Sequence, residues 1–370
     1  SSWVLPLAAV PVRAFGCLSG MAAGASGAAS KLLSQLSLRH PIVLAPMLGA
    51  STPELVAAVA NQGGLGMVAG GSMPAEALGE VLRLTRALLH GPTSVIGVNL
   101  FVPAGCWTER ERWTQPQRAA AEEASRRHAA AAEELSELQG SQVTVPQVQP
   151  LESLEANFSK QVDVLLEQGV RVVSFHFGWP RASEAERLRA AGALLLSSAT
   201  SVEEAAALER YGADAIIAQG WEAGGHRGTF LNAQNYRSEA CVGTLPLTRA
   251  VAAAVSVPVI SAGGIMDGSD ISAALGEGAC AAMLGTLFLA AEECAAPRVH
   301  KEALLAGNAG EAAPTEVTQG FTGKPARAIV NDWVLRMRDI EAELPNCFNA
   351  MPAGRAVAGG GAGGRQPGRV

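Results

Sequence analysis

The residues best suited to chemistry lie in the segment 218–228, which reads AQGWEAGGHRG. Histidine changes charge near neutral pH, so His226 can take up or release a proton under ordinary conditions. Gly224 and Gly225 allow the backbone to approach a ligand closely, and Arg227 places a cation beside the histidine. A single histidine is more often structural than catalytic, but the glycines and the position directly after an expected strand favour chemistry here. We therefore predict that His226 is a catalytic residue.

Glycines also follow two later strands that the sequence predicts. The first pair is Gly263-Gly264, within VISAGGI, and the second turn is Gly285-Thr286, within MLGT. Backbone N–H groups at such turns, together with a helix N-terminus, can hold an anion such as phosphate. Ordinary strand-to-helix turns also contain glycine, so either turn alone is weak evidence. Their occurrence after consecutive strands predicts a phosphorylated ligand.

Three other strand ends carry candidate ligand contacts. Pro46 and Met47 follow the first expected strand, and Asn99 ends the third. An asparagine can hydrogen-bond the heteroatom edge of a ring while a methionine packs on its face. A strand cap and a core methionine are the structural alternatives. His176 ends the fourth strand, where it either lines the site or is a buried core histidine.

The composition limits the classes of protein that this chain can be. The 370 residues have a net charge of −6, and 48% of them are hydrophobic. This supports a large core and argues against a disordered chain, and no basic block predicts nucleic acid as a partner. No apolar run reaches the length that crosses a bilayer, so we expect no membrane partner. The six cysteines have no zinc-site spacing, so we predict no metal site and reduced thiols.

The candidate residues need strands to position them, and short apolar runs bounded by turn residues supply these. We expect eight strands, at Ile42–Ala45, Leu65–Val68, Val95–Asn99, Arg171–Phe175, Ala193–Ser197, Ala215–Ala218, Pro258–Ser261 and Ala281–Leu284.

Most intervals between these strands read as helices, and several begin with an N-cap or an early proline, as at Thr52-Pro53. Continuous apolar strands that alternate with helices predict parallel strands buried on both faces. Eight such units close a (β/α)8 TIM barrel, whose active site lies at the C-terminal ends of the strands. The helices are expected at Thr52–Asn61, Pro74–Leu89, Leu154–Gln168, Ala182–Ala190, Ser201–Tyr211, Leu247–Val255 and Gly268–Glu277.

The sequence also suggests attachments to the barrel, which should span residues 39–291. Residues 103–150 form an oversized insertion after the third strand, and residues 292–352 are expected to form a small helical cap. The Gly-rich end, 353–370, reads as a disordered tail. Residues 1–38 lack acidic side chains and resemble a transit peptide, so we expect them to be dispensable for folding. The expected location is a mitochondrion or plastid if these residues are a transit peptide, and the cytoplasm otherwise.

At the level of motifs, the chain resembles the nitronate monooxygenases, formerly called 2-nitropropane dioxygenases. The similarity runs in the family's order over roughly residues 40–335, and AQGWEAGGHRG is its most specific part. The other matching motifs are PIVLAPM (41–47), GLGMVAGG (64–71), GVNLFVP (97–103), VVSFHFG (172–178), PVISAGGI (258–265), LGT (284–286) and TGKPAR (322–327).

This resemblance implies an FMN-dependent enzyme that oxidises alkyl nitronates with O₂ and needs no nicotinamide. It places the family's catalytic histidine at His226, and His176 is a candidate for substrate contact. FMN supplies the redox chemistry, and the protein orients the reactants. The implied FMN contacts fall on Ala45, Pro46, Met47, Asn99, Gln219, Gly224, Gly264, Met283, Leu284, Gly285 and Thr286.

Two other functions fit the same motifs. A flavin-dependent enoyl-acyl-carrier-protein reductase shares the barrel and a GGH element, and it would need NAD(P)H and an acyl chain. A barrel that binds flavin or phosphate without catalysis is the second alternative. The arginine of GGHRG favours nitronate oxidation, and the presence of His226 argues against a non-catalytic protein. The oligomeric state is left open.

Overall fold

The computed structural model describes residues 32–91, 94–103, 151–231, 241–307 and 314–339, and also residues 123, 126, 127 and 130. Its main sheet has eight parallel strands in the order β1-β9-β8-β6-β5-β4-β3-β2. Each predicted strand is present within a few residues of its expected bounds. The strands are β1 (Ile42–Leu44), β2 (Gly66–Gly71), β3 (Ile96–Phe101), β4 (Val172–His176), β5 (Leu194–Ala199), β6 (Ala215–Gln219), β8 (Val259–Ala262) and β9 (Ala281–Leu284).

The two ends of this sheet meet, so the sheet forms a barrel. Val43 on β1 makes a parallel bridge with Leu65, directly before β2. Leu65 donates its N–H to the Ile42 carbonyl at 2.9 Å, and Leu44 donates to the Leu65 carbonyl at 2.9 Å. The predicted (β/α)8 TIM barrel is therefore confirmed.

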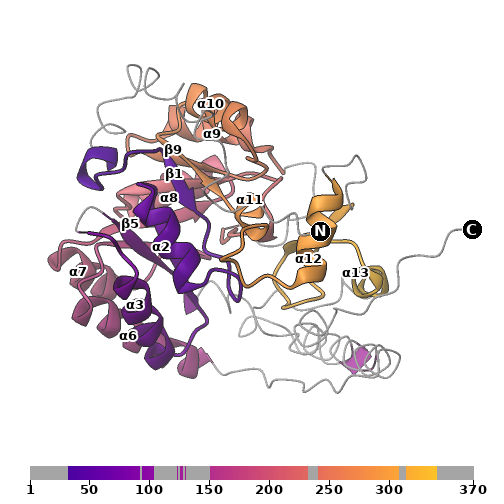
Figure 1. Ribbon diagram of the computed structural model, residues 1–370, viewed down its shortest axis with the longest axis horizontal. Helices are drawn as coiled ribbons and strands as arrows, with labels where there is room; N and C mark the ends of the chain where they lie inside the picture. The colour runs from indigo at the N-terminus through magenta and orange to yellow at the C-terminus, as the bar shows by residue number, and fades with distance from the viewer. Residues whose placement is uncertain are drawn as a thin grey trace, which may run out of the picture.

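Helices connect the strands and surround the sheet (Figure 1). Their starts follow local capping: the Thr52 hydroxyl accepts the Leu55 N–H, and the Asp267 carboxylate accepts from two backbone N–H groups of the next turn. The helices are α2 (Pro53–Asn61), α3 (Ala75–Ala87), α6 (Leu151–Glu167), α7 (Ala182–Ala190), α8 (Val202–Arg210), α9 (Thr244–Ala254), α10 (Gly268–Gly276) and the short α11 (Thr286–Leu289).

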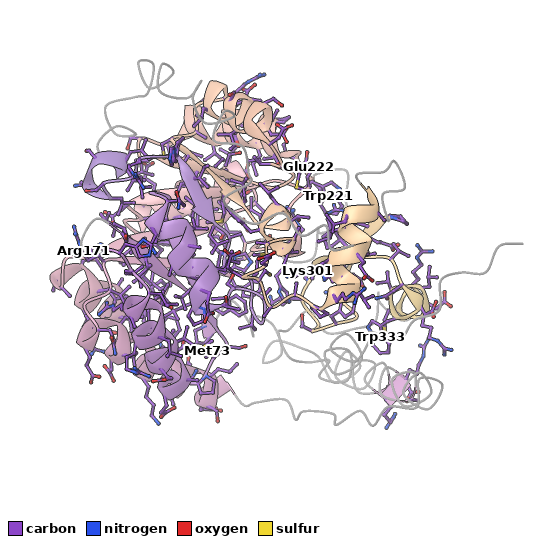
Figure 2. All side chains as sticks on the ribbon, viewed as in Figure 1. Met73, Arg171, Trp221, Glu222, Lys301 and Trp333 are labelled. Carbon is purple, nitrogen blue, oxygen red and sulfur yellow. The ribbon has the colours of Figure 1, made fainter. Side chains whose placement is uncertain are left out.

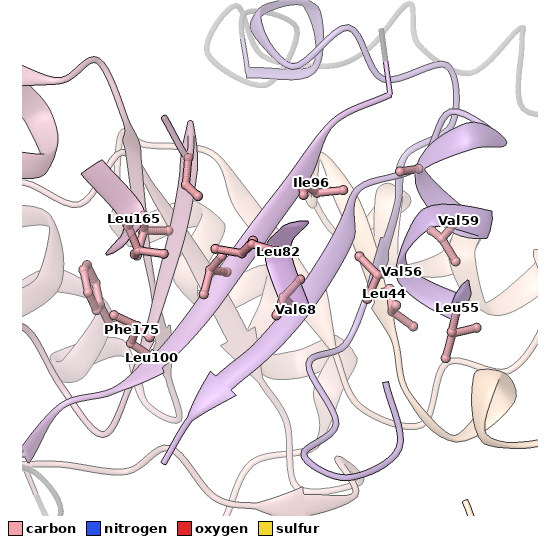
Figure 3. Packing of buried hydrophobic residues seen from close by; sticks show 14 of the residues in the cluster. Leu44, Leu55, Val56, Val59, Val68, Leu82, Ile96, Leu100, Leu165 and Phe175 are labelled. Carbon is pink, nitrogen blue, oxygen red and sulfur yellow. The ribbon is translucent and has the colours of Figure 1, made fainter. Parts of the chain in front are cut away.

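The core has two layers, because barrel strands are buried on both faces. Outward-facing residues such as Leu44 and Val68 pack against the apolar faces of the helices, including Leu55 and Val56 of α2 (Figure 3). Inward-facing residues such as Val43 and Met67 fill the barrel interior. The alternation along each strand thus decides which side chains reach the centre of the barrel.

Residues 32–38 pack against the barrel, although we expected the first 38 residues to form a leader outside the fold. Residues 32–35 are helical, and Leu32 and Leu36 are only 4% and 3% exposed. Both pack with Val43, Leu65 and other inward-facing residues of the barrel. These two leucines close the floor of the barrel. The sequence before them is rich in serine and alanine, and this composition conceals the point where the fold begins. Residues 1–31 lie outside the described part of the chain.

The described residues after β9, 292–307 and 314–339, form the cap, which is not purely helical as we expected. It contains α12 (Arg298–Gly307) and α13 (Asp332–Met337), but β10 (Thr315–Thr318) and β11 (Ala326–Ile329) lie between them. These strands pair antiparallel with each other, and β11 also pairs with β7 (Gly225–His226). The cap helices stand beside the barrel in Figure 1. This three-stranded sheet joins the cap to the barrel.

Several expectations fall on residues that the structure does not describe. These are the insertion 103–150 beyond Pro103, apart from four residues, and the Gly-rich tail 353–370. Within the described ranges, no helix has both the length and the apolar character that crossing a bilayer requires.

Candidate active site

Four neighbouring strands, β1, β9, β8 and β6, bring most of the predicted flavin contacts together at their C-terminal ends. A Cβ added at Gly285 would lie 3.4 Å from the Ala45 Cβ and 3.7 Å from the Met47 Sδ. One added at Gly224 would lie 3.6 Å from the Thr286 hydroxyl oxygen. Side chains at these glycines would fill the space between the strand ends. The glycines therefore keep a cradle open and line it with backbone.

Gly263 and Gly264 complete this cradle after β8. Their φ angles are +128° and +66°, which other residues rarely adopt. A Cβ on Gly263 would lie 2.6 Å from the Thr244 hydroxyl, and one on Gly264 would lie 3.0 Å from the Glu222 Cβ. A glycine turn with positive φ can direct backbone N–H groups at an anion, so the residues present fit the phosphate of a flavin nucleotide. We call Ala45, Pro46, Met47, Gly224, Gly263, Gly264, Gly285 and Thr286 the flavin cradle.

Met283 and Leu284, also predicted to contact FMN, face opposite ways. Met283 packs among the inward-facing residues of the barrel, whereas Leu284 packs in the outer layer under the helices. The Leu284 carbonyl accepts the Ala45 N–H at 2.8 Å. Only the backbone of Leu284 can therefore take part in the cradle, while the Met283 side chain can reach a ring bound over the barrel.

His226 lies where the barrel meets the cap, two residues after Gly224 of the cradle. It pairs with Ala326 of β11, and the Arg227 N–H donates to the Pro325 carbonyl at 2.9 Å. Its Nε2 atom lies 2.8 Å from the hydroxyl oxygen of Thr322, which precedes β11. The predicted catalytic histidine is thus held by a segment about a hundred residues further along the chain.

Two aromatic rings pack against the His226 ring, and a buried lysine lies over one of them. The Phe101 and Phe177 rings meet it edge to face, with centroids 6.1 Å and 5.9 Å away. Lys324, 1% exposed, places its Nζ 5.5 Å from the Phe177 centroid. We call His226, Phe101, Phe177, Thr322 and Lys324 the His226 cluster. It combines a polar imidazole with apolar walls and positive charge, which suits a small anion with an apolar part.

Gln219, predicted to contact FMN, uses both ends of its side chain to hold the histidine loop. Its Nε2 donates to the His226 carbonyl at 2.8 Å, and its Oε1 accepts the Gly228 N–H at 2.7 Å. The residue is buried at the end of β6. These bonds show that it fixes the backbone on both sides of Arg227, whatever it contacts in addition.

His176, predicted to contact substrate, lies beneath His226 with both ring nitrogens engaged. Its Nε2 donates to the His226 carbonyl at 3.2 Å, since a carbonyl can only accept. Its Nδ1 then accepts from the Ser198 hydroxyl at 2.9 Å. Burial lowers the pKa of His176 to about 4; the bond to the His226 carbonyl raises it, and the charges of Arg227 and Lys324 lower it. This ring is neutral at pH 7 and supports the histidine loop.

Asn99, predicted to hydrogen-bond the flavin ring, is buried in the barrel and paired with β4. Its Nδ2 donates to the Ser174 hydroxyl at 2.9 Å and to the Ser174 carbonyl at 3.3 Å. The amide nitrogen is therefore used inside the protein. The Oδ1 atom of Asn99 is the part of this side chain that could accept a hydrogen bond from a ligand.

Two arginines stack on Trp221 where the barrel faces the cap. The guanidinium carbons of Arg227 and Arg327 lie 5.1 Å and 4.9 Å from the Trp221 ring centroid. Arg327 also donates to the Trp221 carbonyl at 2.8 Å, and Arg227 donates to the Gly220 carbonyl at 3.0 Å. Burial lowers the pKa of both arginines. Trp221 and Glu222 lie on the side of the barrel towards α12 (Figure 2). Because Arg227 follows β7 and Arg327 lies on β11, their contacts with Trp221 hold these two strands to the end of β6.

Glu204, in the first turn of α8, anchors the other end of the histidine loop. Its Oε1 accepts from the Thr229 hydroxyl at 3.0 Å and from the Phe230 N–H at 2.7 Å. Its Oε2 accepts from the Thr200 N–H and hydroxyl at 2.7 Å and 2.8 Å. A buried carboxylate with this many donors is well compensated. The loop is therefore fixed to the barrel on the far side of His226.

A cavity of about 510 Å³ opens next to the His226 cluster, and Phe177 belongs to both. Its wall includes Trp179, Tyr211 and Phe230, with Arg189 at the rim. None of the residues predicted to bind flavin line it. The cavity is thus separate from the flavin cradle, and His226 itself does not line it.

Sequence reasoning missed four residues of the His226 cluster. Thr322 and Lys324 belong to TGKPAR, a motif that the resemblance included without giving its residues a role. Phe101 and Phe177 look like ordinary apolar strand residues. The signal available for Phe177 is its position between His176 and Gly178 at a strand end; its φ of +67° is visible only in the structure.

Comparisons with known proteins show which family the chain resembles over most of its length. A sequence model of the nitronate monooxygenase family matches residues 30–360. A probable nitronate monooxygenase from Staphylococcus aureus is 37% identical over 323 residues, which are 86% of this chain and 82% of that protein.

Two solved structures are also similar. A nitroalkane oxidase from Streptomyces ansochromogenes superposes with a TM-score of 0.73 at 37% identity, covering 89% of this chain and 88% of its own. FabK from Thermotoga maritima superposes with a TM-score of 0.62 at 28% identity, covering 89% and 82%.

Proposed function

The chain belongs to the nitronate monooxygenase family of flavin oxidoreductases, and from this membership we propose that it binds FMN and oxidises alkyl nitronates with O₂. The observation that carries the proposal is the pairing of a glycine-lined cradle with the His226 cluster across one barrel mouth. The likeness to the nitroalkane oxidase supports it, since it exceeds the likeness to FabK in both identity and TM-score.

The flavin cradle would hold FMN. Gly264 and Gly285 would offer backbone to its phosphate, and Ala45 and Met47 would lie beside its ring. When bound, the flavin supplies the exchange of electrons with substrate and with O₂. Met283 points into the barrel and would contact the ring from below.

The His226 cluster would hold the nitronate. A nitronate is an anion with an apolar substituent, so it is favoured by the buried Lys324 and by the phenylalanine rings. The neutral state of His176 leaves the positive charge near the substrate with Lys324 and Arg227. The same surroundings would disfavour a cationic substrate.

His226 would act on the proton of a neutral nitroalkane. A general base removes the proton next to the nitro group, and an imidazole suits this task near neutral pH. Thr322, Gln219 and His176 hold the ring or its backbone in place while the proton moves. A preformed nitronate has already lost this proton and would need only the positive surroundings.

The decisive experiment measures O₂ uptake by the purified yellow protein with a panel of alkyl nitronates and the matching neutral nitroalkanes. We expect turnover without NAD(P)H, and FMN as the flavin released on denaturation. NAD(P)H consumption with crotonyl thioesters, in place of nitronate turnover, would favour an enoyl reductase. Bound flavin with no turnover in either assay would favour a non-catalytic barrel, and release of FAD would contradict the FMN assignment.

A further inference from the structure

Thr322 comes from the cap and contacts the ring of the proposed catalytic histidine. Its hydroxyl oxygen lies 2.8 Å from His226 Nε2, across a sequence separation of 96 residues, and the residue is 4% exposed. A buried hydroxyl at this distance restricts the rotation of an imidazole, because turning the ring away would break a hydrogen bond that water cannot replace.

The backbone of His226 is fixed independently of Thr322. It pairs with Ala326 of β11, and its carbonyl accepts from Gln219 and His176 at 2.8 Å and 3.2 Å. With the backbone held, the orientation of the ring depends on the rotation of the side chain. The Thr322 hydroxyl restricts this rotation of the His226 side chain.

Thr322 is itself held in place by a tight turn. The Lys324 N–H approaches the Thr322 hydroxyl oxygen at 3.4 Å, and Gly323 has a φ of +87° and donates to the Gln319 carbonyl at 2.8 Å. Hydroxyl-to-backbone bonds two residues apart stabilise such turns. The hydroxyl is therefore directed at His226 before any substrate arrives.

We propose that Thr322 is a positioning residue that sets the orientation of the His226 imidazole, so that proton abstraction depends on the docked cap. The inference rests on the proposed function for its consequence in catalysis, but the contact itself is independent of substrate. A ring displaced by about 1 Å loses roughly a hundredfold in rate, which sets the scale of the effect.

The test compares Thr322→Val with Thr322→Ser. Valine keeps the shape and removes the hydroxyl, whereas serine keeps the hydroxyl. We expect Thr322→Val to lower kcat on a neutral nitroalkane by about tenfold to a hundredfold with little change in KM. Thr322→Ser should restore most of this loss, and turnover of a preformed nitronate should fall much less.

Thr318→Val is the matched control. Thr318 is a fully buried threonine of β10 whose hydroxyl accepts the Gly320 N–H at 3.0 Å. This substitution removes a comparable bond from the cap without touching His226. A similar loss of kcat in Thr318→Val would mean that general loosening of the cap explains the result, and it would overturn the proposal.

A second measurement needs no substrate. The chain has six histidines, so ¹⁵N-labelled imidazole resonances can be assigned by comparison with His226→Asn. Thr322→Val should shift the His226 Nε2 resonance, and Thr322→Ser and Thr318→Val should leave it close to its original position. An unchanged resonance in Thr322→Val would overturn the proposal. If the wild type turns over no nitro compound, the proposed function fails, while this spectrum still decides the contact.

Discussion

The two halves of the barrel mouth are built in different ways. The flavin cradle consists mainly of glycines and small residues from the ends of β1, β6, β8 and β9, and it presents backbone. The His226 cluster consists of side chains, and Thr322 and Lys324 come from the cap. The flavin cradle therefore depends on positions that have no side chain, whereas the His226 cluster depends on specific contacts between side chains.

This difference teaches where each half is vulnerable. In the cradle, any larger residue fills space that the ligand needs, so substitutions should act through flavin binding. In the His226 cluster, removing a functional group leaves the cradle intact, so substitutions should act on turnover of the flavin-loaded protein. Flavin content and turnover per flavin can thus be used to tell the two halves apart.

The largest effect is expected for Gly264→Glu in the cradle. The φ of +66° already disfavours a side chain, and a Cβ would lie 3.0 Å from the Glu222 Cβ. The added carboxylate would also repel a phosphate. We expect a colourless protein that FMN does not restore, measured by absorbance after reconstitution.

Gly276→Glu is the control, because nothing lies within 4 Å of a Cβ at Gly276 at the end of α10. It adds the same charge and should keep its flavin. A yellow, active Gly264→Glu protein would refute the role of the cradle.

The next largest effect is expected for His226→Asn in the other half. Loss of a general base typically costs about 10²–10⁴-fold, so turnover of neutral nitroalkanes should fall by that amount. FMN content should not change, since His226 is not part of the cradle. Turnover of a preformed nitronate should fall much less.

Steady-state O₂ uptake with both substrate forms checks the expected difference. Equal losses on the two forms would mean that His226 does not abstract the proton. Loss of FMN in this variant would show that the two halves of the mouth are not separable.

The cradle could be predicted from the sequence because it follows from local rules. Glycines directly after strands mark tight turns, and eight alternating units fix which strand ends are neighbours. The sequence alone therefore predicts that Gly264 and Gly285 lie at the same mouth of the barrel. The barrel was predictable for the same reason, since each strand and helix is specified by its own apolar pattern.

The His226 cluster could not be predicted in the same way. The partner of His226 is 96 residues away, in a turn between two short strands that no periodicity marked. Gln219 and His176 look like ligand contacts from their strand-end positions, but their bonds to the His226 carbonyl depend on a loop that folds back. Leu32 and Leu36 were missed because they lie in a short leucine-containing stretch directly after a long segment rich in serine and alanine.

The barrel floor lies away from both halves of the mouth, so a substitution there should change stability without changing flavin binding or turnover. Leu36→Ala should lower the free energy of unfolding by about 2–5 kcal/mol, because it leaves a cavity at a side chain that is 3% exposed. Gln35→Ala, at an exposed neighbouring position, should have almost no effect. Thermal or urea unfolding measures both variants.

At temperatures where Leu36→Ala remains folded, its flavin content and turnover per flavin should match the wild type. A selective loss of either one would mean that the floor communicates with one half of the mouth. A fully stable Leu36→Ala protein would show that Leu36 does not contribute to the stability of the barrel floor.

The smallest effect concerns His176, which supports the His226 loop from inside the barrel. Its pKa falls from 6.5 to about 4 in the folded protein, chiefly because the ring is buried. Between pH 6.5 and 4 the unfolded chain binds a proton at this residue that the folded chain does not. The free energy of unfolding is therefore unaffected by His176 above pH 6.5, and it declines as the pH falls below 6.5, by about 1.4 kcal/mol per pH unit.

His176→Gln should remove this part of the pH dependence of the free energy of unfolding. Unfolding of both proteins at pH 7.5, 6 and 5 measures the difference. His40→Gln is the control, since burial and Arg39 also lower the pKa of His40 but that ring is only partly buried. Parallel slopes for the wild type and His176→Gln would mean that folding does not lower the pKa of His176, so that its ring takes up a proton below pH 6.5 in the folded protein too. In that case the charge beneath His226 would belong to the cluster that we assign to nitronate binding.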